Sequence, residues 1–349
     1  MNNQDTMRHV RAVLRSPILR LVGTAVGLLL LVHGINVGQA LNVVGHADTR
    51  LVALALGLTA LGLSCAVIAW SIVVRATGAS VALPRIASWY LQGVFVGHVT
   101  PSGAGGDATR ATRLIREIGH GRGIASLAAT RMASGLSMAL CGFIGALIAN
   151  VSFGVPIIVA AAIYLGVMAC FWWIALGAHR GVRMLQKSER RVVAGIIRSV
   201  TPVTEALASF RSTPRALLAC VGMAIAGWML NIFALQTFAA AVGVHQPPAI
   251  FAVVVPISLI ATLAPVAING IGLREGVLVG LLLHLGEDPA RSGALALLID
   301  LQLVPFAIIG AGLFIRTRRR HRMEVAPSME PASGMELASG MELATSSAI

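Results

Sequence analysis

Residues 101–110 read Pro-Ser-Gly-Ala-Gly-Gly-Asp-Ala-Thr-Arg, and residues 265–275 read Pro-Val-Ala-Ile-Asn-Gly-Ile-Gly-Leu-Arg-Glu. In both stretches a glycine follows the proline by five positions and an arginine follows it by nine, and apolar sequence surrounds both. Proline and glycine interrupt helices, and a charged side chain within a bilayer costs roughly 2.5 to 3.5 kcal/mol on insertion scales. We therefore expect the repeated pattern to have a function.

The composition identifies the surroundings of both stretches as membrane-spanning sequence. Of the 349 residues, 56% are hydrophobic and 12% are charged, and the mean hydropathy is +0.83. A soluble domain carries about 25% charged residues, whereas a helix that crosses a hydrocarbon core of ~30 Å needs ~20 apolar residues. The sequence therefore predicts an all-α, polytopic membrane protein. The stretches that reach this length are residues 18–37, 51–74, 124–150, 155–177, 216–242 and 294–315.

The distribution of positive charge predicts the orientation of these spans. The net charge of +13 does not indicate nucleic-acid binding, because the basic residues lie in the gaps between apolar stretches rather than along one face. With the amino terminus in the cytoplasm, only Arg50 and Arg291 fall in predicted outer loops. We therefore expect a protein of the cell inner (plasma) membrane with both termini in the cytoplasm. The small residues at 38–40 leave a cleaved signal peptide as an alternative, but the long first apolar stretch favours an uncleaved helix.

The same orientation places the two patterns in hairpins that enter from opposite sides. Residues 86–122 leave the cytoplasm and return to it, and residues 250–286 leave the outside and return there. The arm 274–285 is about 18 Å long as a helix at ~1.5 Å per residue, which is too short to cross the bilayer. We expect about six full spans plus two opposed re-entrant helical hairpins in an inverted repeat, with the substrate site where the interrupted helices meet. Trp89 and Tyr90, at the start of the first hairpin, are interpreted as interface anchors.

This arrangement divides the chain into four parts. Residues 1–17 are a basic cytoplasmic amino terminus, and residues 18–150 form the first membrane repeat. Residues 155–316 form the second repeat, in which residues 187–211 are expected to be a cytoplasmic interfacial helix with apolar residues on one face and arginines around it. Residues 317–349 are basic and then low in complexity, and we expect them to be a disordered cytoplasmic tail.

The first pattern carries the chemistry of an anion site. Gly105 and Gly106 can open a helix whose free N–H groups attract a phosphate, and Arg110 adds a two-pronged donor. The alternative is that the glycines only permit a tight hairpin and that Arg110 pairs with Asp107. We favour a functional role because a second copy faces the first. The residues of that copy are Gly270, Gly272, Arg274 and Glu275.

Residues beside the two patterns allow more than one interpretation. Arg131 lies about two turns into the next apolar stretch, where it could bind a phosphate, although snorkelling to the cytoplasmic surface or a structural pair is favoured. His98 lies just before the first pattern and could line the same cavity. Asp300 could face that cavity, but a pair with Arg291 is favoured.

No nucleotide, metal or redox site is expected. A P-loop needs Gly-Lys-Ser/Thr, and Lys187 is the only lysine in the chain. The cysteines stand singly, without the spacing of a zinc site, and are interpreted as packing residues. We therefore predict no cofactor and no disulfide. The four cysteines are Cys65, Cys141, Cys170 and Cys220.

The two patterns together resemble the lysylphosphatidylglycerol synthase transmembrane family, also called the flippase-like family. Residues 101–110 match P-x-G-x-G-G-D-x-x-R, residues 265–275 match P-x8-R-E with an N-G-x-G core, and Arg131 matches an arginine early in the following span. The likeness covers about residues 10 to 320. It implies a polytopic inner-membrane protein that moves lipids between leaflets, and it does not carry over the activity of the soluble synthase domain found in some members.

The chain departs from the pattern of that family at three positions. Asp107 stands where glutamate is more frequent, and Asn269 stands where glycine is frequent, a change that the left-handed tolerance of asparagine allows. Thr130 stands where glutamate is common, so no ion pair is carried over to that position.

The expected function is movement of an anionic or phosphate-linked lipid between leaflets, with a phospholipid or a polyprenyl- or hopanoid-type lipid as substrate and no nucleic-acid partner. Arg110 and Arg274 would bind the headgroup phosphate from opposite sides. Asp107 and Glu275 would hold these arginines in the empty state, in the crossed pairs Asp107–Arg274 and Glu275–Arg110, and one carboxylate would take up a proton. The alternatives are a membrane-embedded headgroup transferase, which would lack a recognisable nucleophile, and an accessory subunit of a lipid-modifying enzyme.

Overall fold

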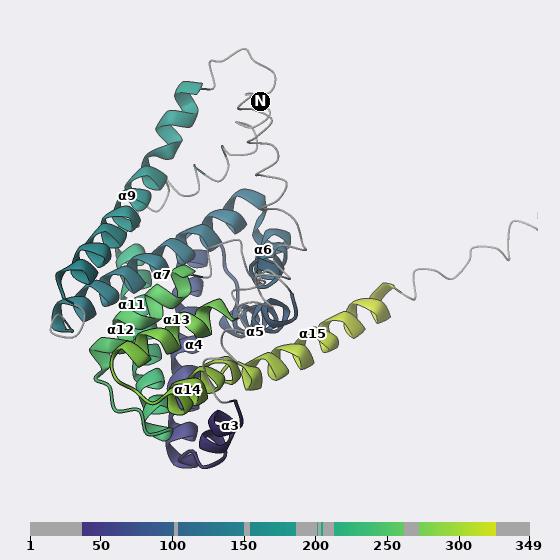
Figure 1. Cartoon of the computed structure of the whole chain (residues 1–349). Coiled ribbons are helices and arrows are strands. Elements are labelled where there is room, and N and C mark those ends of the chain that lie inside the picture. The colour runs from purple at the N-terminus through teal and green to yellow at the C-terminus, as the bar shows by residue number, and fades with distance from the viewer. Residues whose placement is uncertain are drawn as a thin grey trace, which may run out of the picture.

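The computed structural model describes residues 37–100, 104–149, 154–185, 201, 204, 213–261 and 272–325 (Figure 1). All regular elements among these residues are helices. They are α3 (Val37–Gly45), α4 (Thr49–Ala76), α5 (Leu83–Val99), α6 (Ala104–Ile118), α7 (His120–Ile148), α9 (Val155–Leu185), α11 (Pro214–Ala241), α12 (Pro248–Ala261), α13 (Leu273–His284), α14 (Pro289–Leu301) and α15 (Val304–Val325).

Several predicted features lie outside the described residues. They are the first span apart from Val37, most of the interfacial helix over 187–211, Pro101, the segment 262–271 that includes Gly270, and the part of the tail after Val325. The helix α15 itself continues past residue 316, where the second repeat was expected to end, as far as Val325.

Five helical stretches in the described part of the chain are long and apolar enough to cross a membrane. Four of them are the single helices α4, α7, α9 and α11, which match predicted spans. Local signals set their ends: the Asp48 side chain accepts a hydrogen bond from the Arg50 N–H (2.8 Å) and caps α4, and Gly78, with a φ of 79°, turns the chain after it. These helices agree with the predicted all-α, polytopic membrane protein.

The last predicted span, residues 294–315, lies within the fifth of these stretches, Pro289–Thr317, which consists of two helices with a short turn between them. Helix α14 ends at Leu301, residues 302 and 303 form a turn, and α15 begins at Val304. Pro305 explains the break, because a proline lacks an N–H and its ring collides with the carbonyl four residues earlier, here that of Leu301. Gln302 keeps right-handed helical dihedrals (φ −56°, ψ −30°), and its N–H still donates to the Leu298 carbonyl oxygen, so the break is local.

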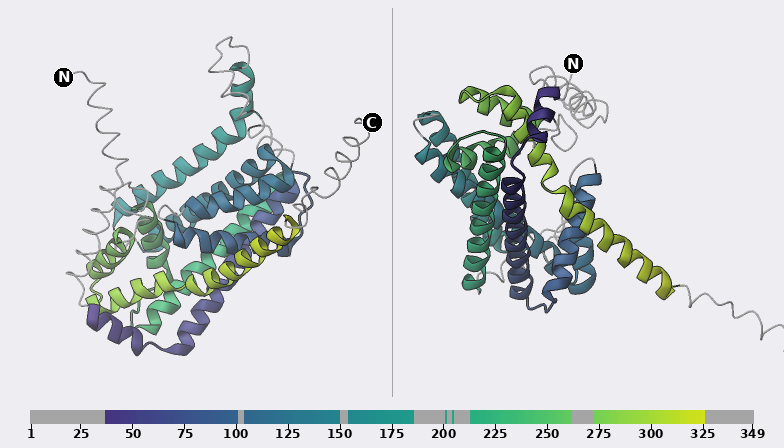
Figure 2. Two further views of the ribbon diagram at one scale, coloured as in Figure 1. Left: turned by 90° about the vertical axis from the view of Figure 1, so that its right-hand side faces the viewer. Right: turned by 90° about the horizontal axis from the view of Figure 1, so that it is seen from below.

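Helices α4 and α11 pack side by side (Figure 2), and a glycine in each lies at their crossing. Each helix has 28 residues, and Gly62 and Gly227 are the fourteenth residues of α4 and α11. A Cβ atom on either glycine would lie 3.4 Å from the carbonyl oxygen of the other. Small residues at such a crossing let two membrane helices approach closely.

The two predicted hairpins correspond to two pairs of short, packed helices, α5 with α6 and α12 with α13. Each pair also packs on the end of the other half of the chain, because α5 contacts α15 and α12 contacts α7. Glycines permit this approach: a Cβ on Gly310 of α15 would overlap the Leu91 carbonyl of α5, and one on Gly145 of α7 would lie 2.6 Å from the Ala252 side chain of α12. Similarly, α7 packs on α9, and α14 packs on α3.

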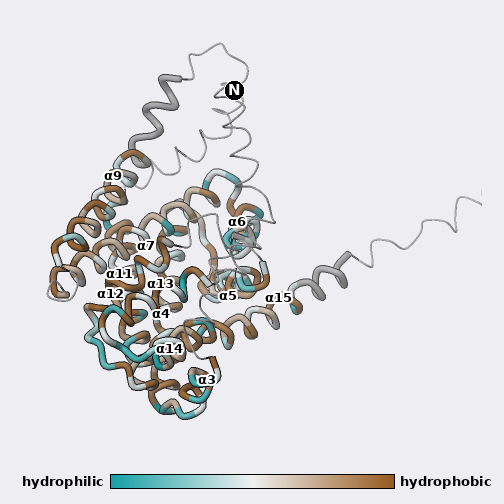
Figure 3. Tube along the Cα trace, in the orientation of Figure 1, coloured by the Kyte–Doolittle hydropathy of each residue, from teal (hydrophilic) through white to brown (hydrophobic). Residues whose placement is uncertain are grey.

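Many large apolar side chains on the outside of the helices are exposed, and hydrophobic residues make up most of the trace in Figure 3. Helix α9 is an example, since Val159, Ile163 and Val167 recur every fourth residue along one face and are exposed. An exposed face of this kind is unfavourable in water and is suited to contact with lipid tails.

Candidate functional site

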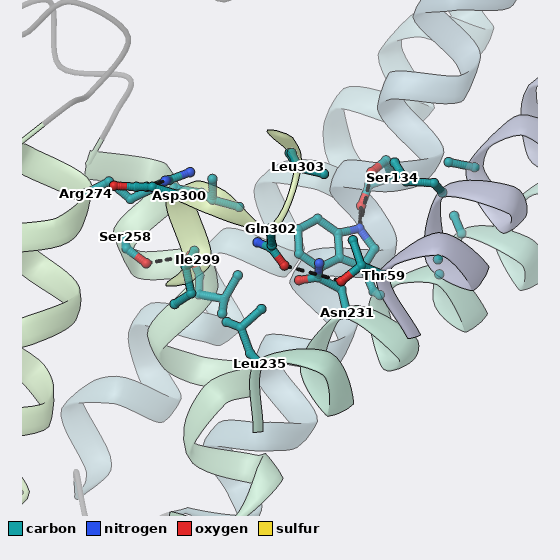
Figure 4. Close-up of a pocket in the computed structure, with 18 of the residues that line it drawn as sticks. Thr59, Ser134, Asn231, Leu235, Ser258, Arg274, Ile299, Asp300, Gln302 and Leu303 are labelled. Atoms are coloured by element: carbon teal, nitrogen blue, oxygen red, sulfur yellow. Dashed lines mark hydrogen bonds and ion pairs between the residues drawn. The ribbon is translucent and has the colours of Figure 1, made fainter. Parts of the chain in front are cut away.

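A cavity of about 300 Å³ lies beside the α4–α11 crossing (Figure 4). Its wall includes Gly62 of α4, Gly227 of α11, Tyr90 of α5 and Thr130 of α7, together with residues of α12, α13 and α14. Both halves of the chain therefore line one cavity. Its volume is at the lower end for small-molecule sites, which suits a lipid headgroup better than a whole lipid.

The charged part of the wall is a cluster of three residues that we name the second-half triad: Arg274, Glu275 and Asp300. Arg274 Nε donates to Glu275 Oε1 (3.0 Å), and Arg274 Nη2 donates to Asp300 Oδ1. With all three ionised, the triad has one positive and two negative charges. The two carboxylates therefore share one guanidinium, and the triad keeps one negative charge that is not compensated.

Local backbone geometry holds this triad in place. Gly272, with a φ of 84°, precedes α13, and its N–H donates to Glu275 Oε2 (2.6 Å). Glu275 thus caps the helix and holds Arg274 at the same time. Asp300 comes from the last turn of α14, just before the interruption of the last span. The interruption also brings Gln302 to the cavity wall.

Asp300 was expected to pair with Arg291, and this expectation is wrong. Asp300 faces the cavity and pairs with Arg274, whereas Arg291 Nη1 donates to the Gly243 carbonyl oxygen (2.9 Å). Pro305 was a signal in the sequence for this arrangement, because a proline at this position ends α14 at Leu301, directly after Asp300.

The first pattern forms a matching cluster, the first-half triad: Asp107, Arg110 and Arg131. Asp107 Oδ1 accepts from Arg110 Nη1 (3.4 Å) and from Arg131 Nη2. Two arginines therefore share one carboxylate. For Arg131, where snorkelling or a structural pair was favoured, the structure shows a pair with Asp107. The crossed pairs Asp107–Arg274 and Glu275–Arg110 are wrong, since each arginine pairs within its own half.

Arg110 does not line the cavity. Its side chain is 12% exposed, and its guanidinium carbon lies 4.0 Å from the centroid of the Tyr90 ring, which is part of the cavity wall. This stacking is a cation–π contact. Arg110 Nε is buried without a hydrogen-bond partner. The arginine of the first pattern is therefore enclosed by packing, unlike its counterpart Arg274.

The other candidates near the first pattern also lie in packing positions. A Cβ on Gly105 would overlap the Thr100 side chain, and one on Gly106 would overlap the Gly93 carbonyl, so these glycines allow α5 and α6 to approach. His98 Nδ1 is 2.9 Å from the Val94 carbonyl oxygen, one turn earlier, and His98 is not part of the cavity wall. For Gly105 and Gly106 the structure agrees with the alternative of a tight hairpin.

Sequence reasoning missed the neutral polar residues of the cavity. Thr59, Ser134, Trp228, Asn231 and Gln302 lie on its wall. Trp228 Nε1 donates to the carbonyl oxygen (3.0 Å) and the hydroxyl (3.2 Å) of Ser134. An uncharged amide within an apolar span was the available signal for Asn231 and Gln302, because an unpaired amide in hydrocarbon is costly.

The interpretation of Trp89 and Tyr90 as interface anchors is wrong as well. Trp89 is buried, and Tyr90 lies between the cavity and Arg110. Aromatic residues at the start of a hairpin look the same in sequence whether they contact lipid headgroups or a neighbouring helix.

The chain is similar to a family of membrane proteins and to a membrane protein of Methanothermobacter thermautotrophicus. A model of the lysylphosphatidylglycerol synthase TM region matches residues 18–311. A UPF0104 membrane protein of Methanothermobacter thermautotrophicus is 23% identical to the chain over 307 residues, which is 80% of this chain and 87% of that protein.

Proposed function

Since the chain belongs to the lysylphosphatidylglycerol synthase transmembrane family, we propose that it moves an anionic or phosphate-linked lipid between the leaflets of the cell inner membrane. Its termini would lie in the cytoplasm, and the two hairpins would be re-entrant. The family match and the long apolar helices support a multi-pass membrane protein. The charged cavity supports the more specific role.

The observation that carries the proposal is an arginine on the wall of a cavity between apolar helices. Arg274 is one-third exposed and reaches the cavity. A guanidinium is a strong phosphate ligand, and a charged group at membrane depth is expensive unless it has a partner or a function. Arg274 has partners, because Glu275 and Asp300 neutralise it when no phosphate is bound, and its place on the cavity wall supports a function.

An inverted repeat would explain how this cavity is built. The proposal is supported by contacts that recur in the two halves. The contact of α5 with α15 corresponds to that of α12 with α7, and the contact of α14 with α3 corresponds to that of α7 with α9. It is also supported by position, because Arg131 and Asp300 are the twelfth residues of α7 and α14. In transporters with such repeats, the substrate site lies where interrupted helices of the two halves meet.

Competition for Arg274 would couple the triad to transport. An incoming phosphate would compete with both carboxylates for the positive charge of Arg274, since both already contact it. A proton on the displaced carboxylate would remove its charge and lower the cost of leaving it without a cation. Among the described residues, Asp300 pairs with Arg274, and Glu275 pairs with the same arginine.

The experiment is a leaflet-exchange assay in proteoliposomes that contain fluorescently labelled phosphatidylglycerol. The wild-type protein should speed exchange over protein-free vesicles. The variant Arg274→Gln combined with Asp300→Asn, which keeps the triad at net charge −1 and the cavity at similar volume, should not. An equal exchange rate for this variant would refute the site, and a chemically altered lipid after incubation would favour the transferase instead.

A further inference from the structure

The cavity has a second polar end that the charged triad does not account for. Figure 4 shows the Arg274–Asp300 pair on one side and Thr59, Asn231 and Gln302 on the other. We name these three residues the amide end. They come from α4, from α11 and from the turn between α14 and α15, so three separate segments bring uncharged polar groups to one place. Apolar side chains, including that of Leu235, line the cavity near them.

The amide end has hydrogen-bonding capacity to spare. The Asn231 side chain lies on the cavity wall and makes no side-chain hydrogen bond within the described residues. Thr59 Oγ1 donates mainly to the Ala55 carbonyl (2.9 Å), and its contact with Gln302 Oε1 is long, at 3.4 Å. Each amide offers two donors and one acceptor. Most of the capacity of both amides therefore faces the cavity.

Trp228 adds an apolar face beside these groups. Its indole N–H is already bound to Ser134, so the part of Trp228 available to a ligand is its ring. A flat ring next to free amides can hold the C–H face of a polyol or sugar while the amides bind its hydroxyl groups.

On this basis, and resting on the proposed function, we propose that the amide end binds hydroxyl groups of the headgroup whose phosphate occupies Arg274. The substrate class is then a phosphodiester lipid that carries a polyol or a sugar. Uncharged amides can donate to and accept from hydroxyl groups, whereas an ammonium group is better served by the carboxylates of the triad. An acyl chain at this place would leave the amides unpaired, which is costly.

The test compares two lipids that differ in hydroxyl groups but not in charge: phosphatidylglycerol and phosphatidylpropanol. Their binding to the full-length wild-type protein is measured in competition by native mass spectrometry. Phosphatidylglycerol should bind about tenfold more tightly, as expected for one or two hydrogen bonds made only by its glycerol. In Asn231→Leu combined with Gln302→Leu, the ratio should fall to about one because binding of phosphatidylglycerol weakens. Phe233→Leu, at an exposed position of the same helix, serves as the control and should keep the wild-type ratio.

Each outcome separates the two proposals. If the wild-type protein binds both lipids equally, the amide end is not a hydroxyl site and the lipid-transport proposal stands. If the double variant loses both lipids to the same extent, the amides support the fold, and the hydroxyl site is again refuted. If the wild-type protein binds neither lipid, the proposed function fails together with this inference.

Discussion

The two halves of the molecule carry ionic triads of opposite net charge, and two of the three residues in each triad stand at matching positions. Arg110 and Arg274 each follow their proline by nine residues, and Arg131 and Asp300 are each the twelfth residue of the next helix. The first-half triad has two arginines and one carboxylate, and the second-half triad has one arginine and two carboxylates. Matching positions therefore do not imply matching roles.

The surroundings of the two triads explain the division of roles. Arg110 is enclosed by Tyr90 and by the close approach of α5 and α6, whereas Arg274 and both of its carboxylates lie on the cavity wall. A charge that is enclosed in packing stabilises one conformation, and a charge beside a cavity can change partners. We therefore propose that the first-half triad stabilises its hairpin and that the second-half triad binds the lipid headgroup.

The largest expected effect comes from replacing the matched arginines one at a time. Arg274→Gln leaves two carboxylates without a cation beside the cavity and removes the phosphate ligand, and lipid exchange should fall by about 30-fold, as expected for the ~2 kcal/mol of a charge-assisted hydrogen bond. Arg110→Gln should lower exchange by less than about tenfold, because Arg110 does not line the cavity. Initial exchange rates in proteoliposomes at equal protein content measure both. Equal losses would abolish the distinction between the triads.

The next effect concerns the response to a proton gradient. Asp300→Asn imitates a protonated Asp300, so the variant should lose the change in exchange rate that a pH gradient across the vesicle produces in the wild-type protein. The matched change in the first half, Asp107→Asn, should keep that response, since Asp107 is not on the cavity wall. Exchange rates with and without an imposed gradient measure the difference. A normal response in Asp300→Asn would exclude this residue as the proton carrier.

A smaller effect is expected on stability, from one glycine in each hairpin. A Cβ on Gly93 of α5 would overlap the Arg110 side chain and lie 3.0 Å from the Gly106 carbonyl oxygen, so Gly93→Ala should lower stability by about 1–3 kcal/mol. Gly276 of α13 has no atom within 4 Å of its Cβ position, so Gly276→Ala should raise stability by up to about 1 kcal/mol. Melting temperatures in detergent test the pair. A loss of stability in both variants would show that the second hairpin is as tightly packed as the first.

Much of this fold was predictable from the sequence because hydropathy and helix breakers act locally. The spans α4, α7, α9 and α11, and the two pairs of hairpin helices, follow from apolar length and from the two patterns. The triad residues Asp107, Arg110, Arg274 and Glu275 were recognised because charge inside apolar sequence is conspicuous.

The partners of these charges were not predictable, because pairing depends on how helices pack. The crossed pairs seemed natural for facing hairpins, yet each hairpin packs on the last helix of the other half. The amide end was missed for a similar reason: Asn231 and Gln302 are far apart in sequence, and only the α4–α11 crossing and the break before Val304 bring them to one cavity.

The smallest expected effect lies at the open ends of the hairpins, where the two halves again use different chemistry. Arg85 Nη1 donates to Glu117 Oε1 (2.5 Å) in the first hairpin, and Gln246 Nε2 donates to Glu287 Oε1 (2.7 Å) in the second. Arg85 is 57% exposed, so Glu117→Gln should lower stability by no more than about 1 kcal/mol. Melting temperatures at low salt and at 1 M salt distinguish the two ends. The decrease in melting temperature caused by Glu117→Gln should vanish in 1 M salt, where charges are screened beyond about 3 Å. The decrease caused by Glu287→Gln should persist, since the partner of Glu287 is the neutral Gln246.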